Sequence, residues 1–117
     1  MIGQLLVGLI AVLHVYIFVL EMFLWDKPAG LKAFANTPEK AQLTKVLAQN
    51  QGLYNGFLAA GLFWSLIAPE TYAVALANFF LGCVLIAGIY GGLTASKKII
   101  YIQSIPALIA LIAVNFF

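Results

Sequence analysis

The chain has 117 residues, of which 64% are hydrophobic and only 9% are charged. A soluble globule of this size normally carries about a quarter of its residues as charged side chains, so this composition excludes a water-soluble domain and predicts a lipid environment. The net charge of +2 argues against a nucleic-acid partner, and the single cysteine excludes an intrachain disulfide framework. Because no Cys and His residues cluster, we expect neither a metal site nor a cofactor.

Four uncharged stretches are each long enough to cross a bilayer, which requires about 20 mainly apolar residues in a helix. We therefore predict one integral membrane domain over residues 1–117. Its predicted fold is all-α, a four-transmembrane-helix up-and-down bundle. The predicted spans cover approximately residues 2–25, 47–67, 72–94 and 99–117. The first stretch is not read as a cleaved signal peptide, because it lacks a basic start and a small-residue cleavage site.

The lysines predict the orientation of the bundle. Four lie between the first and second spans and two between the third and fourth, namely Lys27, Lys32, Lys40, Lys45, Lys97 and Lys98. In an up-and-down bundle these two connections lie on the same side, and the other side has no lysine or arginine. The positive-inside rule therefore predicts a multi-pass protein with both termini outside the cytoplasm, in the inner membrane if the source is bacterial.

The second helix is predicted to begin well before its membrane span. Thr37-Pro38-Glu39 combines a hydroxyl N-cap, a proline at the first helical position and an acid near the positive end of the helix dipole. A helix from there to about Ile67 has roughly 30 residues and is longer than a bilayer is thick. Its first turns should therefore project on the cytoplasmic side.

The connection before this helix has two interpretations. Pro28 and Gly30 are expected to end the first helix. Leu31 and Phe34, beside Lys32, would suit a lid that lies in the membrane interface. Alternatively, the same residues form a linker whose lysines rest on anionic lipid headgroups.

The first helix carries two ionisable residues, His14 and Glu21. A spacing of seven residues gives about 700° of rotation and roughly 10 Å of rise, so both lie on one face but cannot hydrogen-bond directly. A carboxyl group in a span indicates a functional site by default. The structural alternatives are an ion pair of Glu21 with Lys45 or Lys98 and a neutral packing role for His14.

Further polar residues are expected at the same depth. Asn50, Gln51, Tyr54 and Asn55 fall within an arc of about 140° on the second helix. Tyr90 and Gln103 come from the other two helices, and Pro106 leaves the carbonyl of Ile102 without its helical donor. We predict a polar, ligand- or proton-binding pocket near the cytoplasmic side, formed by His14, Glu21, Asn50, Gln51, Tyr54, Asn55, Tyr90 and Gln103. Each amide could instead only join helices, at about 0.6 kcal/mol.

Small residues recur every fourth position in two helices. Gly52 and Gly56 show this spacing in the second span, and Gly88 and Gly92 show it in the third. Such spacing lets helix backbones touch, and it predicts helix packing rather than a phosphate-binding loop. Two other amides, Asn78 and Asn115, are expected to be isolated in the outer half of the membrane.

Several of these motifs occur together in one known family. They are His14-x-Tyr16-x4-Glu21-Met-Phe-Leu-Trp25, Pro28-x-Gly30-Leu-Lys32-x-Phe34, Thr37-Pro38-Glu39, Asn50-Gln-Gly-Leu-Tyr54-Asn-Gly56-Phe-Leu-Ala-Ala-Gly61 and Gln103-x-x-Pro106-Ala107. The chain thereby resembles, over nearly its whole length, the domain-of-unknown-function family 1304 of small bacterial membrane proteins. The resemblance implies four membrane helices and no established activity.

Three functions remain open from the sequence. The favoured hypothesis is a membrane protein that binds or transports a small molecule, with proton coupling through Glu21. The second is a membrane-embedded enzyme acting on a lipid-like substrate, with Glu21 or His14 as general base. The third is an accessory or scaffold subunit. Membrane lipid is the expected partner, with a small-molecule ligand and a second copy of the chain as further candidates.

Overall fold

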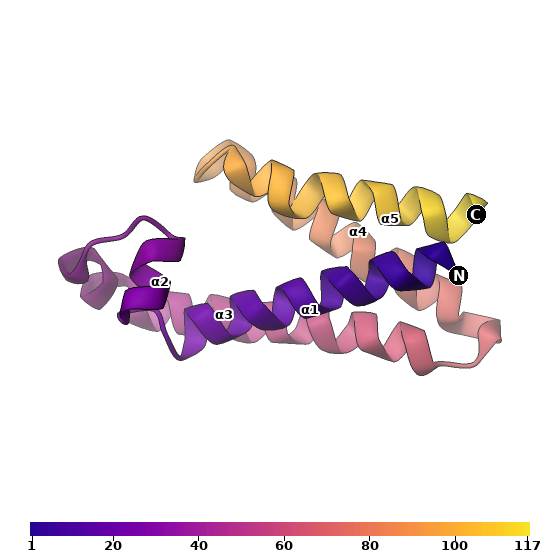
Figure 1. Ribbon diagram of the computed structural model, residues 1–117, viewed down its shortest axis with the longest axis horizontal. Coiled ribbons are helices and arrows are strands. Elements are labelled where there is room, and N and C mark those ends of the chain that lie inside the picture. Colours follow the sequence, from indigo (N-terminus) through magenta and orange to yellow (C-terminus); the bar gives the residue numbers. More distant parts are fainter. The chain divides into compact units, whose positions relative to one another are not determined.

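The computed structural model describes residues 1–117, and all of its regular elements are helical (Figure 1). In chain order they are α1 (Ile2–Met22), α2 (Pro28–Ala33), α3 (Pro38–Ile67), α4 (Glu70–Thr94), the π-helical turn η1 (Ile100–Ser104) and α5 (Ile105–Phe116). The predicted all-α class is therefore confirmed. The chain forms two compact units: unit 1 comprises Met1–Val12 with Leu58–Phe117, and unit 2 comprises Leu13–Phe57.

Two helices, α1 with 21 residues and α4 with 25, are long and apolar enough to cross a membrane. The apolar helical stretch over 100–116 is shorter. The early start of α3 is confirmed. Thr37 Oγ1 accepts a hydrogen bond from the Lys40 amide at 3.3 Å, Pro38 occupies the first helical position, and the helix continues for 30 residues to Ile67.

Unit 1 has a core of small and branched apolar side chains from α1, α3, α4 and α5. Its buried residues are Val7, Ile10, Ala11, Leu62, Ala77, Leu81, Val84, Ala107 and Ala110. The alanines allow α4 and α5 to lie alongside each other (Figure 1). This core contains no charged residue, so its own contacts are apolar packing.

Two glycines of α4, Gly88 and Gly92, lie where α4 meets η1. A Cβ atom at Gly88 would overlap Ser104, and one at Gly92 would overlap Ile100. Ser104 Oγ also donates a hydrogen bond to the Leu85 carbonyl at 2.9 Å. The predicted packing role of these glycines is thereby confirmed.

Pro106 disturbs its helix, as its missing amide hydrogen predicts. The disturbance takes the form of a π-helical turn, in which the Ile105 amide donates to the Ile100 carbonyl instead of to Tyr101. Such turns place one extra residue in the helix and rotate the side chains that follow.

Unit 2 contains the end of α1, α2 and the first two thirds of α3. The predicted end of the first helix near residue 25 is wrong, because α1 ends at Met22 and the Leu24 amide donates to the Val19 carbonyl at 3.2 Å. Pro28 also starts a helix, α2, at a position where its missing amide hydrogen is harmless. At Gly30, any Cβ atom would overlap the Leu24 carbonyl, so this turn requires glycine.

Candidate functional site

A buried hydrogen bond joins the end of α1 to the middle of α3. Glu21 and Asn55 are only 5% and 8% exposed. Asn55 Nδ2 donates to Glu21 Oε1 at 2.6 Å and also to the Gln51 carbonyl at 3.3 Å. The bond to Gln51, one helical turn earlier in α3, holds the Asn55 amide in place. A carboxyl and an amide predicted for the site therefore do meet.

Glycine allows this contact, because it brings the backbones of α1 and α3 close together. A Cβ atom at Gly52 would lie 3.0 Å from Glu21 Cβ and 3.1 Å from the Met22 nitrogen. One turn later, a Cβ atom at Gly56 would lie 3.3 Å from the Phe18 ring. The predicted packing role of both glycines is confirmed, and Glu21 is enclosed by backbone on the side that faces α3.

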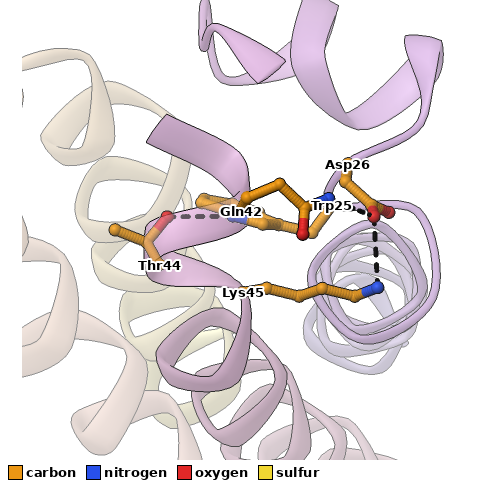
Figure 2. Close-up of polar contacts among 5 residues, drawn as sticks. All are labelled: Trp25, Asp26, Gln42, Thr44 and Lys45. Carbon is orange, nitrogen blue, oxygen red and sulfur yellow. Dashed lines mark hydrogen bonds and ion pairs between the residues drawn. The ribbon is translucent and has the colours of Figure 1, made fainter. Parts of the chain in front are cut away.

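One of the two lysines that the sequence offers as alternative partners for Glu21, Lys45, pairs with another acid. Lys45 Nζ lies 3.1 Å from Asp26 Oδ2 (Figure 2). Gln42 Nε2 donates to the same oxygen at 3.0 Å. The hydrogen bond from Lys45 holds the pKa of Asp26 below its usual range. The neutral amide of Asn55 thus contacts the buried acid, and the cation of Lys45 contacts the acid in the turn.

A third side-chain contact supports the cluster around Asp26. Trp25 Nε1 donates to Thr44 Oγ1 at 3.1 Å (Figure 2). That hydroxyl in turn donates to the Lys40 carbonyl at 2.8 Å. No motif in the sequence predicts this cluster. Its only signal was that Gln42 and Lys45 are three residues apart and so share a helix face with each other.

The residues predicted to form one polar face of α3 differ in their burial. Asn55 is buried, whereas Asn50, Gln51 and Tyr54 are exposed. Asn50 Nδ2 donates to Tyr54 Oη at 3.3 Å, so these two side chains contact each other along the helix surface. His14, in α1, is fully buried.

The remaining two predicted residues belong to unit 1. Tyr90 is 70% exposed on α4. Gln103 is half-buried in η1. Among the predicted site residues, hydrogen bonds join Glu21, Asn55 and the backbone of Gln51 in one group and Asn50 with Tyr54 in another.

Unit 1 has a cavity of about 70 Å³. It is lined by Gln4, Val7, Ser65, Leu66, Ala73, Val74, Ala77 and Val114. None of these is a predicted site residue, so this cavity does not support the predicted polar pocket. Its walls are mainly apolar, and the Ser65 hydroxyl donates to the Leu62 carbonyl at 2.6 Å.

The interpretation of Asn78 and Asn115 as isolated residues is wrong. Each amide donates to the other, at 3.0 Å from Asn78 Nδ2 and 2.7 Å from Asn115 Nδ2. The two residues are 37 positions apart, on α4 and α5, so only the pairing of these helices reveals the contact. No group of three or more His, Cys, Asp or Glu side chains is placed to hold a metal ion.

Comparisons with known proteins agree with the motifs. The model of a family described as "Protein of unknown function (DUF1304)" matches residues 8–115. The chain is 32% identical over 107 residues to "Uncharacterized protein YpaA" of Lactococcus lactis subsp. lactis (strain IL1403), covering 90% of this chain and 89% of the relative. No solved structure matches.

Proposed function

Because this chain belongs to the DUF1304 family, whose function is unknown, we propose its role from the contact between Glu21 and Asn55. The proposed role is a multi-pass membrane protein that binds or transports a small molecule. In this role Glu21 releases a proton when a cationic group of the ligand binds. Membrane lipid surrounds the protein in this role. Two copies of the chain are proposed to form a homodimer.

The exposure of the apolar helices supports insertion into a membrane. Only 33% of the most apolar stretch of α1 and 22% of that of α4 is buried within the chain. A core helix of a soluble protein would bury most of such a stretch, whereas lipid covers these surfaces without cost. In the proposed arrangement α3 and the 100–116 stretch also cross, with all six lysines in the cytoplasm and both termini outside.

The chemistry of Glu21 carries the proposal. A buried carboxylate needs a cation or several donors to offset its lost hydration. The described partner of Glu21 is a single neutral amide. A proton or the cationic group of a ligand removes the unbalanced charge, so the same carboxyl group can exchange one for the other.

Proton release on ligand binding tests this exchange. The purified protein would be reconstituted in weakly buffered liposomes with a pH-sensitive dye, and tetraphenylphosphonium would be added as a lipophilic cation. We expect acidification with the wild type and none with Glu21→Gln, which keeps a hydrogen-bond acceptor for Asn55.

Asp26→Asn is the matched control, because it removes another acid of unit 2, five residues after Glu21. Its signal should equal that of the wild type, since Asp26 is already paired with Lys45. Equal acidification by Glu21→Gln, or no acidification by the wild type, would contradict proton exchange at Glu21.

A scaffold role is the second candidate, and the close approach at Gly52 favours it. In that role the bond between Glu21 and Asn55 only fixes the packing of α1 on α3. A partner protein would then co-purify equally well with the wild type and with Glu21→Gln, and its loss with Glu21→Gln would contradict a purely structural role of Glu21.

A further inference from the structure

Residues 25–45, here called the basic segment, carry more positive than negative charge at their surface. The segment contains four lysines and two acids. Asp26 is paired with Lys45, so neither contributes a free charge. Lys27, Lys32 and Lys40 are exposed, and Glu39 is the one acid left to oppose them.

These lysines are carried by an ordered structure. The turn after α1 is tied to α3 through Trp25 with Thr44 and through Asp26 with Lys45 (Figure 2). The ring of Phe34, just after α2, lies 4.9 Å from that of Trp25. Because both ends of α2 are held in this way, Lys27 before α2 and Lys32 within it keep defined positions on the surface.

Exposed apolar side chains lie beside this charge. Leu43 and Leu47 follow Lys40 on one face of α3 and are 85% and 71% exposed. Phe23, in the turn that precedes α2, is 60% exposed. Lysines next to exposed leucine and phenylalanine are typical of surfaces that lie in a membrane interface, where lysine reaches headgroups and apolar groups enter the acyl boundary.

We propose that the basic segment binds the surface of an anionic phospholipid bilayer through Lys27, Lys32 and Lys40, with Leu43 and Leu47 in the acyl boundary. Charge complementarity selects this partner, because Lys45 neutralises Asp26 and the three exposed lysines outnumber Glu39, the remaining acid of the segment. The inference depends on the proposed membrane insertion, and it does not depend on proton exchange at Glu21.

Quenching of Trp25 fluorescence by brominated lipids tests the inference. Trp64→Phe leaves Trp25 as the only tryptophan, since the chain has two. The variant would be reconstituted in mixtures of phosphatidylglycerol and phosphatidylcholine in which one lipid or the other is brominated. At low salt we expect brominated phosphatidylglycerol to quench more, and a single lysine contact corresponds to roughly a fivefold preference. High salt should reduce the preference.

Two double variants, each of which removes two positive charges, distinguish the contribution of the basic segment from that of lysines elsewhere in the chain. Lys27→Gln with Lys32→Gln should abolish most of the preference, whereas Lys97→Gln with Lys98→Gln should leave it intact. An equal loss in both would overturn the inference, because overall charge would then explain the preference. Circular dichroism would check that each variant retains its helices.

Three further outcomes would count against the inference. Equal quenching by the two brominated lipids would refute headgroup selection and leave membrane insertion intact. No quenching by either lipid would refute both. A loss of preference on adding inorganic phosphate, but not chloride of equal ionic strength, would show a site for free phosphate instead of a lipid surface.

Discussion

Glu21 and Asp26 are two acids five residues apart in unit 2, and they differ in burial and in their hydrogen-bond partners. Glu21 lies in α1, is 5% exposed and accepts a hydrogen bond from a neutral amide. Asp26 lies in the turn after α1 and accepts from Lys45 and Gln42. A cation balances the charge of Asp26 and fixes the turn, whereas the charge of Glu21 has no such balance and can respond to a ligand.

The largest expected effect comes from separating α1 from α3 at Glu21. Gly52→Val would place a branched side chain at a position where even an added Cβ atom would lie only 3.0 Å from Glu21 Cβ. Overpacking of this kind costs about 1–3 kcal/mol of unfolding free energy, which denaturant titration in mixed micelles measures.

Gly82→Ala is the control for Gly52→Val, because a Cβ atom at Gly82 meets nothing within 4 Å. This variant should be neutral or slightly more stable, since alanine favours helix more than glycine does. Equal losses in the two variants would show that helix propensity, and not contact with α1, governs both positions.

The next effect concerns the amide that holds Glu21. Asn55→Leu removes the 2.6 Å donor from a buried carboxyl group and should cost about 1–3 kcal/mol. Glu21→Gln should cost much less, because its amide oxygen still accepts from Asn55. If the two variants unfold at the same denaturant concentration, the hydrogen bond does not stabilise this contact.

A smaller effect of opposite sign is expected at the end of α2. Ala35, just after α2, has a φ of 50°, which is a left-handed conformation that glycine adopts more readily. The amide of Asn36 donates to the Leu31 carbonyl and that of Ala35 to the Lys32 carbonyl, the pattern of a Schellman helix end. Ala35→Gly should therefore stabilise the fold by about 1 kcal/mol in the same titration.

The smallest effect should depend on pH. The pKa of Asp26 is lowered in the folded protein by the hydrogen bond from Lys45. Its contribution to stability is therefore complete above the usual aspartate pKa and is lost as pH falls through the lower folded-state value. Melting temperatures of the wild type and Asp26→Asn should differ slightly at pH 7 and converge in acid. A difference that persists in acid would mean that the charge of Asp26 is not its cause.

Local signals in the sequence predicted part of this structure. Thr37-Pro38-Glu39 predicted the start of α3, because capping depends on adjacent residues. Gly52 and Gly88 predicted close helix contacts, because small-residue spacing is itself the condition for such contacts. Glu21 was singled out because a carboxyl group is rare within an apolar stretch.

The rest depends on contacts between distant residues. The sequence alone offers Lys45 as a partner for Glu21, but the turn after Met22 brings Asp26 to Lys45 instead. The pair of Asn78 and Asn115 required the register of α4 against α5. Helical periodicity alone also cannot separate buried Asn55 from exposed Tyr54, because both fall within the same polar arc.

Infrared difference spectroscopy is the most direct test of proton exchange at Glu21. Tetraphenylphosphonium would be added to the protein in lipid bilayers, and the carboxyl bands would be recorded. We expect the wild type and Asp26→Asn to lose a carboxylic acid band and gain a carboxylate band, and we expect neither change in Glu21→Gln. Unchanged bands in the wild type, or the same change in Glu21→Gln, would contradict proton exchange at Glu21.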